Sequence, residues 1–495
     1  MSAGLSSMAA GQQIAALRLN ARPIAHSLSP CFEGRPFVGD VGAHSSGLSA
    51  SGRMKSLLYP GRAVALVFLL AILCGSILLS LPVAHAHGES APWVTAFFTA
   101  VSAVCVTGLV VVDTGTYWSL FGQSVIMLLF QLGGFGMMTL ATLLGLLVNR
   151  SFRLRTKLIA QAESHVLGLG DISGVAKLVL VVTLGMELVI MLLLTLRLHL
   201  SYGLPWGEAA WSGLFHAVSA FNNAGFSIHG DSLVRYSSDA LILLPVMMAI
   251  VIGGLGFPVL YDLRSKFSDP RHWSLHTKLT LSGTAVLLVG GFLTLLLFEW
   301  SNPNTLGPMA WPEKLLSAAF ASVSARTAGF NSIDIDALTH ESWALHYFLM
   351  FIGGGSAGTA GGVKVGTVAI LALLVIAEIR GRTDSEAFGR RVGSSAQRQA
   401  ITVLVLGSAM VVLGTLVILR ETDFPTDQVI FEVISAFGTV GLSTGITADL
   451  PESSQLMLTL LMYVGRVGII TLAASLALGE HRMPYRYPEE QPIVG

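Results

Sequence analysis

Residues 430–441 read IFEVISAFGTVG, an apolar stretch about half as long as a membrane-spanning helix, ending in a glycine turn. Three other stretches have the same form: AFFTAVSAVCVTG at 96–108, GLFHAVSAFNNAG at 213–225 and SAAFASVSARTAG at 317–329. Their last glycines recur at intervals of 117, 104 and 112 residues, at Gly108, Gly225, Gly329 and Gly441. Four matches in register indicate a fourfold internal repeat.

The rest of the chain has the composition of an integral membrane protein. Of its 495 residues, 53% are hydrophobic and only 12% are charged, about half the charged share of soluble domains. Uncharged stretches of spanning length occur at 63–83, 114–149, 240–261, 279–298 and 399–419. Three more include few ionisable residues: 178–196 with Glu187, 344–377 with Lys364 and 455–479 with Arg466.

Together these stretches predict an all-α integral membrane fold. Its eight transmembrane helices form four tandem span, pore-loop and span repeats, whose re-entrant pore helices surround a pseudo-fourfold central pore. The expected segments are an N-terminal tail at 1–53, repeats at 54–150, 151–265, 266–380 and 381–480, and a C-terminal tail at 481–495. The first tail has the composition of a disordered segment; alternatively, the true start is Met54.

The distribution of charge predicts the orientation of the chain in the cell membrane. The segments that join the repeats, or that flank the first and last spans, hold 19 Lys and Arg residues. The loops that carry the four half-length stretches hold five, together with 16 acidic residues. By the positive-inside rule, both termini are cytoplasmic and the half-length stretches open outward. An acidic outer vestibule would concentrate cations.

Several function classes are disfavoured. Lys plus Arg equals Asp plus Glu at 29 each, so the chain lacks the basic footprint of a nucleic-acid-binding protein. Cys31, Cys74 and Cys105 have neither disulfide-framework nor zinc-ligand spacing. The chain contains no HExxH or GxSxG motif, and we expect no enzyme activity. His216 is a lone histidine in a half-length stretch, which favours a structural role.

The repeated glycines suggest an ion filter. Glycine permits a positive φ, so successive carbonyls of one strand can face a common axis. Four such strands would form rings of oxygens that replace the hydration shell of potassium, and Thr439-Val440-Gly441 matches part of the TVGYG filter sequence. The predicted ligands, mainly through backbone carbonyls, are Cys105, Val106, Thr107, Gly108, Asn222, Asn223, Ala224, Gly225, Arg326, Thr327, Ala328, Gly329, Gly438, Thr439, Val440 and Gly441. The alternative is that these glycines only let helices pack closely.

The four motifs resemble those of the Ktr/Trk/HKT superfamily of potassium-uptake proteins over about residues 54–495. The similar segments are SAVCVTGLVVVD at 102–113, SAFNNAGF at 219–226, RTAGFN at 326–331 and SAFGTVGL at 435–442. Some sodium-passing members of the family carry serine at the position of Gly108, so this resemblance favours potassium. The runner-up function is a Trk-like or less selective pathway for potassium and sodium.

A second glycine cluster lies within the sixth span. The segment 353–362 has six glycines in ten residues, too many for a stable lipid-facing helix. By resemblance, it is an intramembrane gate loop beneath the filter, and an arginine matching Arg466 opposes cations beside it. The expected gate residues are Gly353, Gly354, Gly355, Ser356, Gly358, Thr359, Gly361, Gly362, Lys364 and Arg466. The alternatives are a static kink and an ion pair between Arg466 and Glu187.

The C-terminal sequence YPEEQPIVG most resembles the Ktr-type membrane subunit, whose C-terminus contributes to a homodimer contact, here at Gly495. The resemblance also implies a cytoplasmic ring of RCK-type nucleotide-binding regulatory subunits. ATP, ADP or NAD(H) would act only through that ring, because this chain lacks a GxGxxG motif in a nucleotide-binding context. Sodium is a candidate stimulating ion. The basic linkers 150–157 and 380–398 are either docking surfaces or topogenic charge.

Overall fold

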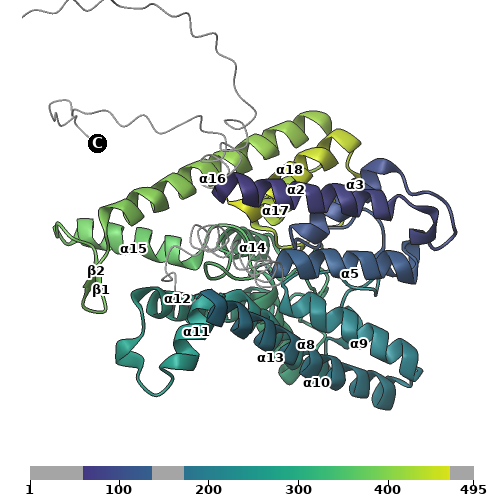
Figure 1. Ribbon diagram of the computed structural model, residues 1–495, viewed down its shortest axis with the longest axis horizontal. Coiled ribbons are helices and arrows are strands. Elements are labelled where there is room, and N and C mark those ends of the chain that lie inside the picture. The colour runs from purple at the N-terminus through teal and green to yellow at the C-terminus, as the bar shows by residue number, and fades with distance from the viewer. Residues whose placement is uncertain (1–59, 136–171, 469–495) are drawn as a thin grey trace, which may run out of the picture. The chain divides into compact units, whose positions relative to one another are not determined.

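The computed structural model describes residues 60–135 and 172–468, which are mostly helical (Figure 1). The predicted tails at 1–53 and 481–495, the linker 150–157 and Gly495 lie outside the described residues. The elements are α2 (Pro60–Leu79), η1 (Pro82–Ala84), α3 (Trp93–Val104), α4 (Thr114–Tyr117), α5 (Leu120–Gly134), α8 (Ile172–Tyr202), α9 (Trp206–Phe221), η3 (Val234–Tyr236), α10 (Ala240–Leu255), α11 (Phe257–Ser265), η4 (Pro270–His272), α12 (Leu275–Glu299), α13 (Trp311–Ser324), α14 (His340–Phe351), α15 (Val365–Ile379), β1 (Glu386–Ala387), β2 (Arg390–Arg391), α16 (Ser394–Glu421), α17 (Thr426–Gly438), η5 (Ile446–Asp449) and α18 (Glu452–Val467).

Long apolar helices are present, as the composition predicts. Within the described ranges, α8, α12 and α16 are each long and apolar enough to cross a membrane. The pair α10 and α11 also passes this test as one span, but it bends by 93° at a short break. Their outer faces expose large apolar side chains, such as Leu200, Val286 and Leu416. The full set of eight spans stays a prediction.

The four half-length stretches form the short helices α3, α9, α13 and α17, whose C-terminal halves are buried. Each short helix packs on the longer helix that precedes it: α2, α8, α12 and α16 respectively. The helix α5 lies between α3 and α9, α10 between α9 and α13, and α18 between α17 and α3. The order of contacts therefore closes on itself, and Figure 1 shows α18 beside α2 and α3.

Several of the predicted spans differ from one continuous helix: 114–149 is interrupted between α4 and α5, and within 455–479 the helix α18 ends at Val467, before Gly468 with a φ of 88°. The expected span 344–377 is interrupted between α14 and α15, where residues 353–362 are not helical, as the glycine cluster predicts. The expected span 240–261 ends at Leu255 because Gly256 has a φ of 93°, a conformation that breaks a helix. That bend was not foreseen from the sequence.

A buried acid joins two long helices on the side predicted to be extracellular. Glu299, at the end of α12, is fully buried. Its carboxylate accepts hydrogen bonds from the backbone N–H and the hydroxyl of Thr339 at 2.9 and 2.8 Å, and from Asn302 Nδ2 at 2.7 Å. Thr305 and Ser342 also donate to it. Since buried donors are costly to leave unpaired, Glu299 fixes the start of α14 against the end of α12.

We predict that Glu299→Gln destabilises the protein, because a glutamine amide replaces one acceptor oxygen by an NH₂ group that faces hydrogen-bond donors. The expected loss in the free energy of unfolding is about 1–3 kcal/mol. It is measured as a lower melting temperature of the detergent-purified protein. Glu341→Gln, an exposed acid in the first turn of α14, is the matched control. Equal melting temperatures for the two variants would contradict this role.

Candidate functional site

The same backbone turn follows each short helix. We name residues 105–108, 222–225, 326–329 and 438–441 turns 1 to 4. In every turn, the residue two before the glycine is left-handed despite its side chain: the φ values are 59° at Val106, 59° at Asn223, 68° at Thr327 and 49° at Thr439. The glycines also have positive φ values: 91° at Gly108, 70° at Gly225, 77° at Gly329 and 95° at Gly441.

These backbone angles are energetically unfavourable. A residue with a side chain pays about 1–2 kcal/mol in the left-handed region. Such residues persist only where their surroundings fix them, and they cluster at functional sites. Four occurrences at equivalent positions of four turns therefore mark this part of the chain as a candidate functional site.

A serine near the end of each short helix holds the turn that follows. The backbone carbonyl of this serine accepts the N–H of the residue before the glycine: Thr107 to Ser102 at 2.8 Å, Ala224 to Ser219 at 2.8 Å, Ala328 to Ser324 at 3.0 Å and Val440 to Ser435 at 2.8 Å. The serine hydroxyls make a second set of bonds, from Ser102 to Leu109 O, Ser219 to Phe226 O and Ser324 to Phe330 O, and from Gly441 N to Ser435.

This pattern sets the direction of the carbonyls. In a trans peptide, the C=O of one residue points opposite to the N–H of the next. Because the N–H of Thr107 points back to Ser102, the carbonyl of Val106 points away from α3. The same relation holds in the other three turns. The serine precedes the glycine by six residues in turns 1, 2 and 4 and by five in turn 3, and this recurrence was the available signal in the sequence.

The four turns meet one another in cyclic order. A Cβ added at each glycine would collide with the carbonyl before the next glycine: 2.4 Å from Gly108 to Ala224 O, 2.9 Å from Gly225 to Ala328 O, 2.4 Å from Gly329 to Val440 O, and 2.1 Å from Gly441 to Thr107 O. The structure thus brings the predicted turn residues together in one ring of backbone. We call this the glycine ring.

A cavity of ≈ 360 Å³ opens on the glycine ring, and all four ring glycines line it. Its walls also include Asp113 and His229. The His229 ring stacks on His216 with 4.9 Å between centroids. Burial, reinforced by Arg235, lowers the pKa of His229, so its imidazole is neutral at neutral pH. Asp113 therefore gives this wall of the cavity a negative charge.

The glycine-rich segment 353–362, which we call the glycine loop, lies against turns 3 and 4 and does not line this cavity. A Cβ at Gly361 would lie 2.0 Å from Thr439 Oγ1, and a Cβ at Gly353 would lie 3.3 Å from Thr327 Cγ2. The neck of the loop is closed by two backbone hydrogen bonds, from Gly353 N to Val363 O at 2.8 Å and from Val365 N to Gly354 O at 3.0 Å.

The glycine loop is bound to the break between α10 and α11. Gly355 N donates to Gly254 O at 2.7 Å, and Phe257 N donates to Ala357 O at 3.1 Å. A Cβ at Gly256 would lie 2.4 Å from Ser356 O, so only glycine fits this contact. The bend that interrupts this span thus serves to seat the loop.

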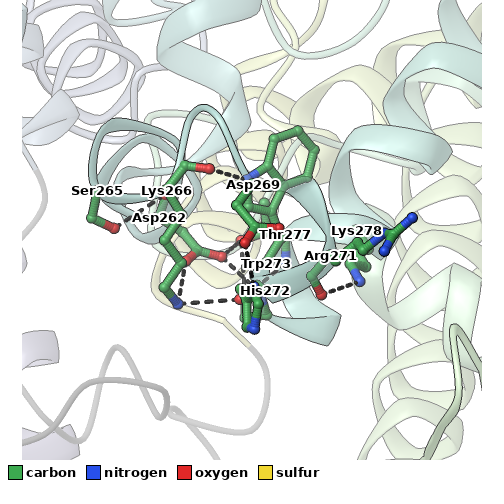
Figure 2. Close-up of polar contacts among 10 residues, drawn as sticks. Asp262, Ser265, Lys266, Asp269, Arg271, His272, Trp273, Thr277 and Lys278 are labelled. Carbon is green, nitrogen blue, oxygen red and sulfur yellow. Dashed lines mark hydrogen bonds and ion pairs between the residues drawn. The ribbon is translucent and has the colours of Figure 1, made fainter.

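The far end of α11 is anchored to the start of α12, as Figure 2 shows. Asp262 accepts hydrogen bonds from Ser274 N and Thr277 Oγ1, both at 2.8 Å, and forms an ion pair with Lys266 at 3.1 Å. Trp273 Nε1 donates to Lys266 O at 3.0 Å, which tightens the linker between the two helices. The buried carboxylate of Asp262 therefore helps to hold α11, whose first residue bonds to the glycine loop, against the start of α12.

The two predicted gate cations both contact the glycine loop. Arg466 in α18 donates to Thr359 O in the loop and to Gly133 O in α5. Lys364, which precedes the first residue of α15, donates to Ala360 O at 2.5 Å. Glu187 instead accepts hydrogen bonds from the amides of Gln131 at 3.3 Å and Asn222 at 3.1 Å.

Side chains that could bind a metal do not gather in this region. Among residues 60–135 and 172–468, no three His, Cys, Asp or Glu side chains lie close enough together to hold a metal ion. The groups that converge are backbone carbonyls.

The chain is similar to known cation transport proteins. Residues 70–481 match the family model TrkH, described as a cation transport protein. Ktr system potassium uptake protein B of Bacillus subtilis is 38% identical over 88% of this chain and 97% of its own length. Potassium/sodium uptake protein NtpJ of Enterococcus hirae is 38% identical over 90% of this chain and 99% of its own length.

A solved structure shares the fold. The crystal structure of the potassium transporter TrkH from Vibrio parahaemolyticus aligns with a TM-score of 0.63 at 18% identity, covering 83% of this chain and 85% of that one. These matches confirm the resemblance to the Ktr and Trk proteins that the four motifs predict. The chain therefore belongs to the TrkH family of cation transport proteins.

Proposed function

We propose that this protein takes up potassium across the cell membrane through the glycine ring. The observation that carries the proposal is the convergence of four backbone turns, each with a left-handed residue two positions before a glycine. Carbonyls so arranged can replace the water around a dehydrated cation. The relatives named for potassium uptake support the choice of ion, and the family consists of transporters, not enzymes.

The proposed architecture is a fourfold repeat of span, pore helix and span with eight transmembrane helices. The closed order of helix contacts and the three long apolar helices support it. Both termini would be cytoplasmic, as the charge distribution predicts. Ions would then enter from the cavity that Asp113 lines, shed water at the glycine ring, and move down their electrochemical gradient.

The glycine loop is the proposed gate. It lies against turns 3 and 4, close enough to obstruct ions that leave the ring. Arg466 donates to its Thr359 carbonyl and would repel cations at this level. Because backbone hydrogen bonds hold the loop to the α10–α11 break, its release would require those bonds to break. A gate needs a second position, and here that would be the loop with these bonds broken.

We also propose that the protein is a homodimer whose contact includes Gly495, and that a cytoplasmic ring of RCK-type subunits regulates it. The relative named as part of a Ktr system supports a separate regulatory component. ATP, ADP or NAD(H) would bind to that component, and sodium would act as a stimulating ion. The exposed Arg390 and Arg391 of the 380–398 segment offer positive charge for docking.

A second candidate function is a less selective pathway for potassium and sodium. The name of the Enterococcus relative, a potassium/sodium uptake protein, favours it. The two candidates share the glycine ring and differ only in how strongly the ring discriminates between the two ions.

The direct test is growth at limiting potassium of a bacterium that lacks its own uptake systems, with and without sodium. We expect the chain to restore growth, alone or with a Ktr-type regulatory subunit. Tracer uptake into proteoliposomes then gives the relative rates for rubidium, a potassium substitute, and sodium. Lack of uptake by well-folded protein, with and without the regulatory subunit, would contradict the proposal. Equal rates for the two ions would favour the second candidate.

Replacing Gly108 with serine is expected to lower selectivity for potassium over sodium. Gly108 has a φ of 91°, and a Cβ there would lie 2.4 Å from Ala224 O, so the ring must distort. We expect the ratio of rubidium to sodium uptake to fall about tenfold, which corresponds to ~1.4 kcal/mol in relative binding.

The matched control for this substitution is Gly88→Ser. Gly88 also has a positive φ, of 75°, but a Cβ there would meet nothing within 4 Å. This variant carries the same backbone strain without the collision, and it should keep the normal uptake ratio. An unchanged ratio in the Gly108 variant would count against the assignment of the filter.

Deleting residues 357–360 should raise unstimulated uptake and leave selectivity unchanged. The deletion removes the bonds that Ala357 and Thr359 make to the α10–α11 break, but keeps the neck and the glycine ring. Uptake is measured without the regulatory subunit. The control Gly366→Ala adds a methyl group to α15 where nothing lies within 4 Å. If the deletion variant keeps its melting temperature and oligomeric state but loses uptake, the loop is not a barrier.

A further inference from the structure

Arg326 is a buried cation whose side chain the filter does not use. It lies in turn 3, one residue before the left-handed Thr327, and only 7% of its surface is exposed. The equivalent positions of the other turns hold Cys105, Asn222 and Gly438. The sequence predicts that Arg326 takes part in the filter through its backbone carbonyl. A guanidinium is unnecessary for that purpose and costly to bury.

The side chain of Arg326 reaches the neck of the glycine loop. Its Nη2 donates to Gly353 O at 3.2 Å, and its Nε has no hydrogen-bond partner. Within the described part of the chain, no carboxylate lies within the 4.0 Å of an ion pair with Arg326. A buried arginine is ordinarily paired with an acid, and an unpaired one is maintained only where its contact matters.

A small cavity lies beside this contact. It has a volume of ≈ 20 Å³, enough for one water molecule, and Arg326, Thr284 and Gly354 are among its lining residues. The Thr284 hydroxyl is buried without a partner, like Arg326 Nε. Arg326 therefore has an unused donor next to the loop, beside a cavity that can hold one water molecule.

The carbonyl that Arg326 holds belongs to the residue that closes the neck. Gly353 N donates to Val363 O at 2.8 Å, so the two ends of the loop are joined at this residue. A Cβ at Gly353 would also lie 3.3 Å from the Thr327 methyl group, next to Arg326 itself. Two adjacent residues of turn 3 thus lie against Gly353: Thr327 is close to it, and Arg326 donates a charged hydrogen bond to its carbonyl.

We propose that Arg326 is a positioning residue that couples turn 3 to the closed position of the glycine loop. Its guanidinium holds the Gly353 carbonyl when the loop is seated, and releases it when the neck moves. Arg326 donates to Gly353 O at the neck of the loop, whereas Arg466 donates to Thr359 O, away from the neck. This inference rests on the proposed function of the loop as a gate.

The test compares Arg326→Lys, Arg326→Gln and Arg326→Met in protein that carries T359C, with Cys31 and Cys74 replaced by serine; Cys105 is fully buried, and Thr359 is only 1% exposed in the seated loop. The readout is the rate at which a maleimide labels the T359C site in detergent. We expect the methionine variant to label about tenfold faster. Loss of the hydrogen bond to Gly353 O should raise the fraction of protein with the loop unseated, and the labelling rate rises by the same factor. Lysine retains a donor and a charge and should stay near the parent rate, with glutamine between the two.

Two controls distinguish a change in the position of the loop from a general loss of folded protein. Arg420→Met removes an exposed arginine at the outer end of α16 and should leave labelling unchanged. Melting temperature shows whether each variant is folded. If the methionine variant fails to fold, the glutamine variant, a neutral donor, decides: labelling at the parent rate would overturn the role of the charge. Equal labelling in all folded Arg326 variants would overturn the proposal.

Tracer uptake then links loop position to transport. We expect the Arg326→Met variant to take up rubidium faster without stimulation, at an unchanged ratio of rubidium to sodium. A purely structural role in turn 3 would instead lower that ratio. The labelling rate does not depend on ion flow. If the parent protein carries no ions but the variants still label as expected, the proposed function fails and the mechanical role of Arg326 stands.

Discussion

The arrangement depends on one constraint, which is that four backbone segments must approach one another without side chains between them. A Cβ added at Gly108, Gly225, Gly329 or Gly441 would collide with the backbone of a neighbouring turn. Larger residues would push the turns apart and separate the carbonyls. The buried ends of the short helices, the serine bonds and the left-handed residues all serve to hold these glycines in contact.

Much of this arrangement could be predicted from the sequence, because it repeats. The recurrence of glycine gave the four turns, and the density of glycine at 353–362 gave the break between α14 and α15. The left-handed residues could not be predicted: Val106, Thr327 and Thr439 are β-branched, a class that rarely adopts this conformation, and the hydrogen bonds around each turn impose it. A sequence therefore reveals the glycines that permit a turn more readily than the hydrogen bonds that impose its conformation.

Contacts between distant segments were also beyond sequence analysis. The bend at Gly256 looks like one more packing glycine until its neighbour, the Ser356 carbonyl, is known. The sequence indicates that Arg326 belongs to turn 3, but it does not indicate that its side chain donates to Gly353 O, 27 residues away. The partners of Glu187 are the amides of Gln131 and Asn222, and neither has a charge that a search for ion pairs would detect.

The glycine loop is the point at which the four predicted repeats contact one another. Its carbonyls accept hydrogen bonds from Arg326 of the predicted third repeat and Arg466 of the fourth, and its backbone pairs with the α10–α11 break of the second. Arg466 also reaches Gly133 in the first. The loop cannot leave its seat without disturbing all four. Since Asp262 ties α11 to the linker before α12, force applied to that linker has a short, hydrogen-bonded path to the loop.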